Sequence, residues 1–212
     1  MRYVAVTLLL LANATASGVE FVETVSRPPA TFPPTLLDIA SHLPLNTPYK
    51  DADLITYAHE GTHGLARGAS TSHGIYILRG LRVLIPTPPV TMLEVERAVP
   101  ESRRGPVYKT YMNQGRHVGW KDQPLMLVDE WVAYTHGSMV RSELNQVSRQ
   151  ETDRYCGELC FYVSVMYTIA KERKAPTGEL RSFCRWNLDR CRKTIANWDG
   201  LPAFTAGAVT FD

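Results

Sequence analysis

Two histidines and a glutamate stand at the spacing that a metal site on a helix requires, because residues 59–63 read His-Glu-Gly-Thr-His. Residues four apart share one face of an α-helix, so His59 and His63 can offer ring nitrogens to one metal ion. Glu60 lies beside the pair, where its carboxylate can take a proton from a water molecule that the metal activates. The pattern predicts a zinc hydrolase site.

A third ligand is needed, because catalytic zinc usually takes three protein ligands and keeps a fourth position open. The residues that directly follow the motif lack the additional histidine of the pattern H-x-x-G-x-x-H. Residues 125–137 are a better source, since they form an apolar stretch with Asp129 and Glu130 in its middle. Ionised carboxylates in apolar surroundings usually need a partner or a metal.

In these two segments the chain resembles the gluzincin group of zinc peptidases, whose third ligand is a glutamate on a second helix packed against the motif helix. The resemblance implies one catalytic zinc ion held by His59, His63 and Glu130, with Glu60 as the general base. It also implies a peptide or protein substrate.

Asp129 is the alternative third ligand, with Glu130 turned outward. We favour Glu130 because Tyr134 follows it by one helical turn and shares its face. Tyr134 would then lie near the metal as a catalytic residue, either bonding a ligand or steadying an oxyanion. The alternative for Tyr134 is an amphipathic tyrosine of the core.

The other histidines are weaker candidates. His136 falls on a different face from Glu130, which favours a cap or a surface position. His73 and His117 stand in expected loops and can reach the site from there. Nothing in the sequence around His42 indicates a role.

The elements that must position these residues can be predicted from local patterns. Asp51 or Asp53 can cap the motif helix, and glycines 64 and 68 suit its end. Gly61 is unfavourable inside a helix by about 1 kcal/mol, which indicates a close approach of backbone or substrate. The apolar stripe of this helix comprises Leu54, Ile55, Ala58, Thr62 and Leu65.

The remaining chain is expected to be mainly helical (α+β), as a compact zincin-like domain with one small β-hairpin. Too few residues precede His59 to build the sheet that usually comes before the motif in gluzincins, so the hairpin is expected to supply the edge for an extended peptide. The Pro-rich residues 18–35 are expected to be extended. The hairpin is expected at residues 74–85, and helices near residues 36–43, 91–99, 106–114 and 123–145.

All four cysteines fall in the last third of the chain, on two expected helices joined by the turn at residues 174–178. In such a hairpin the nested disulfides Cys156–Cys191 and Cys160–Cys184 are the natural pairing of the three possible ones. The alternative is a structural zinc site of four cysteines.

Residues 1–16 read as a signal peptide, with a basic start, a short apolar core and a small-residue cleavage site. The expected location is therefore secreted or periplasmic, with residues 17–212 as one domain. The net charge of +2, the lack of a basic stripe and the lack of a long apolar run argue against nucleic-acid binding and a membrane span.

Three functions are compatible with these patterns. The first is a secreted zinc metallopeptidase that uses Glu60 as its base. The second is a zinc amidase that acts on non-protein amides such as those of cell walls. The third is a catalytically silent secreted zinc-binding protein, which Glu60 disfavours because a purely structural site needs no base between its ligands.

Overall fold

The computed structural model describes residues 30–44, 47, 53–69, 72–113, 120, 122–146, 150–196, 198, 209 and 211–212. The predicted signal peptide, residues 18–29 of the Pro-rich segment, and His117 lie outside these residues. Among the helices of the described part, none combines the length and the apolar character that a membrane span requires.

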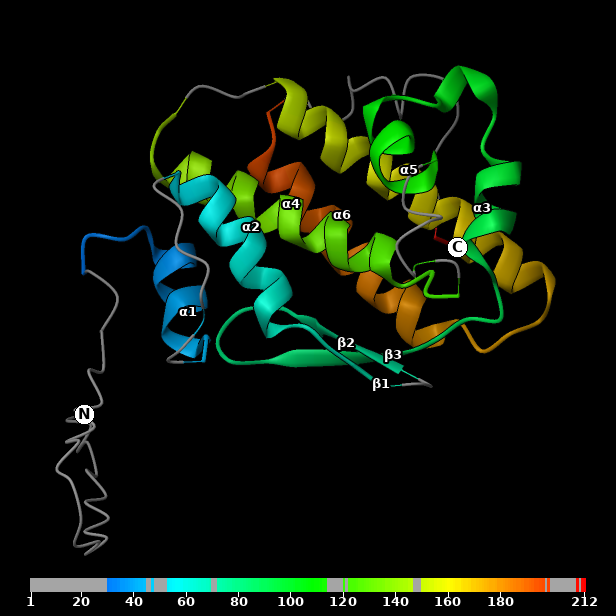
Figure 1. Ribbon diagram of the computed structural model, residues 1–212, viewed down its shortest axis with the longest axis horizontal. Coiled ribbons are helices and arrows are strands. Elements are labelled where there is room, and N and C mark those ends of the chain that lie inside the picture. Colours follow the sequence, from blue (N-terminus) through cyan, green and yellow to red (C-terminus); the bar gives the residue numbers. More distant parts are fainter. Residues whose placement is uncertain are drawn as a thin grey trace, which may run out of the picture.

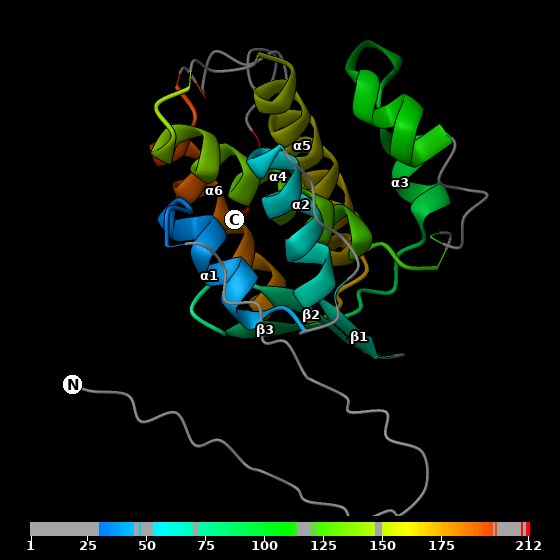
Figure 2. The ribbon, with the colours of Figure 1, turned by 60° about the vertical axis from the view of Figure 1, so that its left-hand side comes forward.

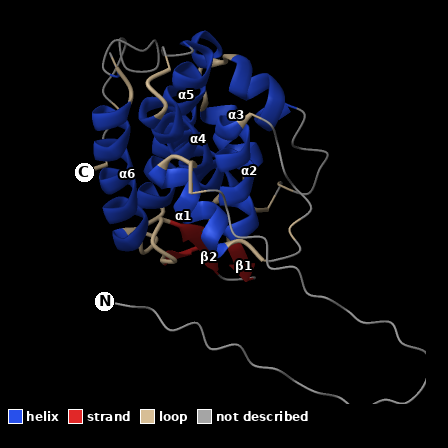
Figure 3. Cartoon of the chain, turned by 90° about the vertical axis from the view of Figure 1, so that its left-hand side faces the viewer, coloured by secondary structure: helices blue, strands red, loops and turns tan. Residues whose placement is uncertain are grey.

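The described residues form a mainly helical fold with one small antiparallel sheet, as predicted. The helices form a layer that covers the sheet (Figures 1 and 3). Helix α4 is central to this layer, because it contacts α1, α2, α5 and α6. The α-helices are α1 (Pro34–His42), α2 (Leu54–Leu65), α3 (Met92–Ala98), α4 (Met126–Glu143), α5 (Gln150–Glu172) and α6 (Gly178–Thr194).

Helix α2 is the motif helix, and it begins as the sequence predicts. The Asp53 side chain caps it by accepting a hydrogen bond from the backbone N–H of Ile55 at 3.2 Å. The helix buries Ile55, Ala58, Thr62 and Leu65 of the predicted stripe. It ends at Leu65, because the next residue is extended and leads into the sheet.

Gly61 lets α1 and α2 approach closely, which explains a glycine inside the motif helix. A Cβ atom on Gly61 would lie 2.7 Å from the Cγ2 atom of the fully buried Ile39 on α1. The unfavourable helix propensity of Gly61 is therefore offset by packing between the two helices.

The sheet directly follows α2 and has the strand order β1-β2-β3. Strands β2 (Ser72–Tyr76) and β3 (Arg82–Pro86) form the predicted hairpin, in which Ile75 is paired with Val83. Strand β1 (Arg67–Ala69) adds a short third strand, which the sequence did not predict. The sheet is thus close to the C-terminal end of the motif helix (Figure 2).

The hairpin turn is fastened to α1. Leu78, Arg79 and Gly80 all have positive φ angles, of 75°, 57° and 69°. Both carboxylate oxygens of Asp38 accept from the backbone N–H of Arg79 at 2.9 Å, and Asp38 also accepts from the hydroxyl of Tyr76 at 2.5 Å. These bonds hold the left-handed turn in place.

Helix α4 carries several polar side chains in buried positions, among them Asp129, Glu130 and His136. Buried polar groups require partners. One such pair lies away from the site, where Arg141 forms an ion pair with Asp153 on α5, both buried.

Helices α5 and α6 form the predicted C-terminal hairpin, with the turn in which Lys174 has a φ angle of 56°. All four cysteines of the hairpin are buried and are free thiols in the structure. The Sγ atoms of Cys156 and Cys191 lie 3.6 Å apart, so one pair of the predicted nested pairing is adjacent but not bonded. The disulfides themselves stay a prediction.

Candidate metal centre

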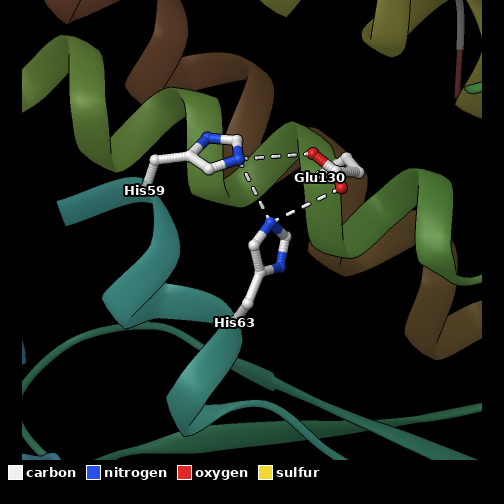
Figure 4. Close-up of side chains that lie close together, drawn as sticks. All are labelled: His59, His63 and Glu130. Carbon is white, nitrogen blue, oxygen red and sulfur yellow. Dashed lines mark hydrogen bonds and ion pairs between the residues drawn. The ribbon is translucent and has the colours of Figure 1, made fainter. Parts of the chain in front are cut away.

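His59 and His63 lie one turn apart on α2 and face α4 (Figure 4). Their Nε2 atoms are 3.2 Å from each other, and the two rings meet edge to face with centroids 4.8 Å apart. The exposed fractions of the two side chains are 13% and 21%, so both remain accessible from one side. The i, i+4 spacing thus brings the two Nε2 atoms close together, as the sequence predicts.

Glu130 on α4 completes this group. One of its carboxylate oxygens, Oε2, lies 3.5 Å from Nε2 of His59, and the other, Oε1, lies 3.5 Å from Nε2 of His63. The ligand atoms of the three residues all lie within 4.8 Å of one another, so this group can hold a metal ion. Among the described residues it is the one cluster of three or more His, Cys, Asp or Glu side chains with this property.

The donor set fits a divalent metal ion such as zinc. Two imidazole nitrogens and one carboxylate are a common zinc ligand set, which leaves a fourth position for water or substrate. The Oε2 atom of Glu130 is buried and accepts no hydrogen bond from the described residues, which is costly unless another group satisfies it. A cation at the centre of the group would satisfy this oxygen.

Asp129 contacts a different nitrogen of His63 than Glu130 does. Its Oδ2 atom lies 2.8 Å from Nδ1 of His63, on the side of the ring away from the metal group. Because a carboxylate is an acceptor, His63 donates from Nδ1 and leaves Nε2 as the nitrogen for a metal. The same oxygen lies 3.9 Å from Nε2 of His73, on β2.

The acidic pair strongly changes the electrostatics of the ligands. Burial acts to lower the pKa of His63, but hydrogen bonds to Asp129 and Glu130 outweigh it and raise this pKa to about 10. Burial likewise acts to raise the pKa of Glu130, but its interactions with the imidazoles of His59 and His63 lower it to about 2. A cation that displaces the proton of this group would meet the ionised carboxylate of Glu130.

Tyr134 stands beside the metal group, one turn after Glu130 on α4. Its ring packs against His59 with centroids 4.4 Å apart. Burial raises the pKa of Tyr134 to about 12, and the charge of Glu60 contributes to this rise. Glu60 is exposed on α2, and its charge reaches Tyr134.

Tyr111 is a residue of the site that the sequence analysis missed. Its hydroxyl oxygen lies 3.1 Å from that of Tyr134. Burial and the charge of Glu130 raise the pKa of Tyr111. It belongs to a π-helix, Tyr108–Asn113 (η2), and single π-helical turns are frequent at functional sites. No local signal in the sequence distinguishes it from a core tyrosine.

The structure also corrects two weaker predictions, for His136 and for His73. His136 is fully buried and bonds Thr62 on α2, so the predicted cap or surface position is wrong. His73 lies on β2 rather than on a loop and reaches the acidic pair through Asp129. His42 lies outside the site, beside Asp38 and Tyr76. The four cysteines, all described, do not form a metal group in which three ligand atoms come together.

Comparison of the chain with protein-family models, with curated proteins and with solved structures yields no match. What the site can do therefore follows from its own geometry, which is that of a possible metal centre with two histidines and one glutamate.

Proposed function

We propose that the protein is a zinc-dependent metallopeptidase in which His59, His63 and Glu130 hold the metal. The observation that carries the proposal is the convergence of these three side chains. The exposed Glu60 directly follows His59 in the sequence. A purely structural zinc site is closed by four ligands, whereas this group supplies three, with part of both histidines exposed.

In this proposal a bound zinc ion supplies a Lewis acid that polarises the scissile carbonyl and lowers the pKa of a water molecule. Glu60 accepts the proton of the attacking water and later gives it to the leaving amine. Asp129 keeps the His63 ring in the tautomer that presents Nε2. The hydroxyl of Tyr134 donates to the oxygen on which negative charge develops.

The test compares the wild type with Glu60→Gln. The amide has the same shape but cannot accept the proton, so we expect zinc content and the unfolding temperature to be kept while cleavage falls by at least about 100-fold. Both proteins are incubated with a diverse peptide library and a panel of cell-wall fragments, and cleaved bonds are identified by mass spectrometry. The control is Glu101→Gln, an exposed residue outside the site, which should cleave like the wild type.

The outcomes separate the alternatives. Peptide cleavage by the wild type and by Glu101→Gln but not by Glu60→Gln supports the peptidase. Cleavage confined to cell-wall amides replaces it with an amidase. Zinc bound in all three proteins with no bond cut would leave a zinc-binding protein without turnover.

We also propose that the chain is exported, on the basis of the predicted signal peptide. An N-terminal sequence of the protein from the extracytoplasmic fraction that begins near Ser17 or Gly18 would support export. Recovery of the protein in the cytoplasm with residues 1–16 intact would refute it.

A further inference from the structure

Two tyrosine hydroxyls lie beside the metal group, and the proposed mechanism gives a role to only one of them, that of Tyr134. The hydroxyl oxygens of Tyr111 and Tyr134 are 3.1 Å apart, a hydrogen-bond distance. Tyr134 packs against His59, while burial and the charge of Glu130 act on Tyr111 and raise its pKa. Through this pair the segment around Tyr111, which is far from the motif in the sequence, is connected to the metal group.

We infer that Tyr111 is a positioning residue, which donates its proton to the Tyr134 hydroxyl and so leaves the proton of Tyr134 free for an oxyanion at the metal. A phenol carries a single proton, so only one member of the pair can be the donor to the other. If Glu130 is engaged as a metal ligand, it competes less for the proton of Tyr111, and the oxygen of Tyr134 becomes its acceptor. The inference rests on the proposed function for its chemical meaning.

The surroundings hold Tyr111 in the required place. Its ring stacks on Trp120, with centroids 5.4 Å apart and planes at 12°. The start of its π-helix is fastened by the buried Glu158 of α5, which accepts from the backbone N–H groups of Gly105 and Tyr108 at 2.9 and 3.0 Å. A ring fixed by stacking and by an anchored backbone can orient a hydroxyl at little cost in entropy.

A positioning role and simple packing predict different dependence of the Tyr111 effect on the Tyr134 hydroxyl. If Tyr111 acts through Tyr134, removing its hydroxyl matters only while the Tyr134 hydroxyl is present. If Tyr111 only packs, its removal weakens the site by the same factor in either background. A double-mutant cycle measures this difference.

The experiment uses the full chain loaded with cobalt(II) and inorganic phosphate as the probe, a tetrahedral oxyanion whose binding changes the visible spectrum of the metal. We expect Tyr134→Phe to weaken phosphate binding by about tenfold, as the loss of one hydrogen bond to a charged group implies. Tyr111→Phe should weaken it only several-fold, because it removes a hydrogen bond between two neutral hydroxyls. The double variant should bind phosphate as Tyr134→Phe does.

Tyr108→Phe is the matched control. It removes a hydroxyl from the same π-helix, one that donates to Glu96 at 3.1 Å. It should bind cobalt and phosphate like the wild type. The cobalt content of each variant shows whether the site is intact.

The inference is overturned if wild-type cobalt protein has no affinity for phosphate, if Tyr111→Phe binds phosphate like the wild type, or if the two single effects are additive. If Tyr111→Phe loses cobalt, Tyr111→Met, which keeps apolar bulk against Trp120, repeats the test. The inference is also overturned if both Tyr111 variants lose cobalt while Tyr108→Phe retains it. Because phosphate affinity needs no turnover, an absence of peptide cleavage would refute the proposed function without deciding the role of Tyr111.

Discussion

At the residue scale, two carboxylates that are adjacent in the sequence contact the two different ring nitrogens of one histidine, His63. Glu130 faces Nε2 of His63 at 3.5 Å, whereas Asp129 bonds Nδ1 of the same ring at 2.8 Å. Both carboxylates are almost fully buried, with exposed fractions of 5% and 2%. This division predicts different consequences for two substitutions of the same kind.

We expect Glu130→Gln to lose zinc affinity by more than about 100-fold, because it removes the anionic ligand itself. Asp129→Asn should lose about tenfold, in the range typical for a partner that orients a ligand. The two changes are matched, since each replaces one carboxylate by an amide of equal size. Competition with a chromogenic chelator measures both affinities, and the reverse order of effects would make Asp129 the ligand.

His136 is a second residue whose environment has a measurable consequence. Burial, helped by the positive charge of Arg190, lowers its pKa well below the ordinary value of 6.5. Its Nδ1 atom lies 2.9 Å from the hydroxyl of Thr62, which joins α4 to α2 behind the metal group. The folded protein therefore keeps this imidazole neutral at pH values where the unfolded chain binds a proton.

It follows that the metal-free protein loses stability as the pH falls below about 6.5, by up to about 1.4 kcal/mol per pH unit from this group. His136→Asn, which can still bond Thr62, should show a pH dependence shallower by one proton, despite a lower stability at neutral pH. Urea unfolding at pH 5, 6 and 7.5 in the presence of a chelator measures this. Thr62→Val is the control, because it weakens the contact but keeps the histidine, and equal slopes for His136→Asn and the wild type would contradict the argument.

At the scale of elements, the position of the motif helix depends on its packing against α1. A Cβ atom at Gly61 would lie 2.7 Å from Cγ2 of Ile39, which is branched at Cβ and buried and so cannot turn away. A Cβ atom at Gly64 would instead meet Cδ2 of Leu43 at 2.9 Å, the end of a flexible and half-buried side chain. The two glycines of one helix thus differ in how much space their neighbours can provide.

We expect Gly61→Ala to destabilise the protein by about 1 to 2 kcal/mol, because overpacking costs more than the gain of about 1 kcal/mol in helix propensity. Gly64→Ala should be neutral or stabilising by up to about 1 kcal/mol. Chemical denaturation of both variants measures the free energies of unfolding. A stabilised Gly61→Ala would show that α1 and α2 are not held at the described distance.

At the scale of the whole molecule, the two helices of the C-terminal hairpin pack against the central helix α4 and carry four buried thiols. The Sγ atoms of Cys156 on α5 and Cys191 on α6 both lie near the hydroxyl of Thr135 on α4, at 3.5 and 3.2 Å. Burial raises the pKa of the thiols of Cys156 and Cys160 well above the usual value. The reactive thiolate is therefore scarce in the folded protein.

We expect the reduced, folded protein to react slowly with a thiol reagent and quickly after denaturation. Material folded under oxidising conditions should contain the Cys156–Cys191 disulfide, which peptide mapping detects, and should be more stable by about 3 to 4 kcal/mol. Cys156→Ala is the control that prevents this bridge. Free thiols in the oxidised material, or a different pairing of Cys156, would contradict the prediction.

The sequence by itself determined those features whose signals are local. The i, i+4 histidines, the cap at Asp53 and the apolar stripe predicted the motif helix, because helix periodicity and capping depend only on neighbouring residues. In the same way, the turn near Gly80 predicted the β2–β3 hairpin, although the three-residue strand β1 was too short to leave a pattern.

The tertiary structure alone decided which distant side chains meet. The sequence offers both Asp129 and Glu130 as ligands and favours Glu130 only through Tyr134. The rotation of α4 against α2 turns Glu130 toward Nε2 and Asp129 toward Nδ1 of His63. The burial of His136 and the arrival of Tyr111 next to Tyr134 depend on the same packing. Such contacts join residues far apart in the chain, so they follow from how the helices pack and leave no periodic signal in the sequence.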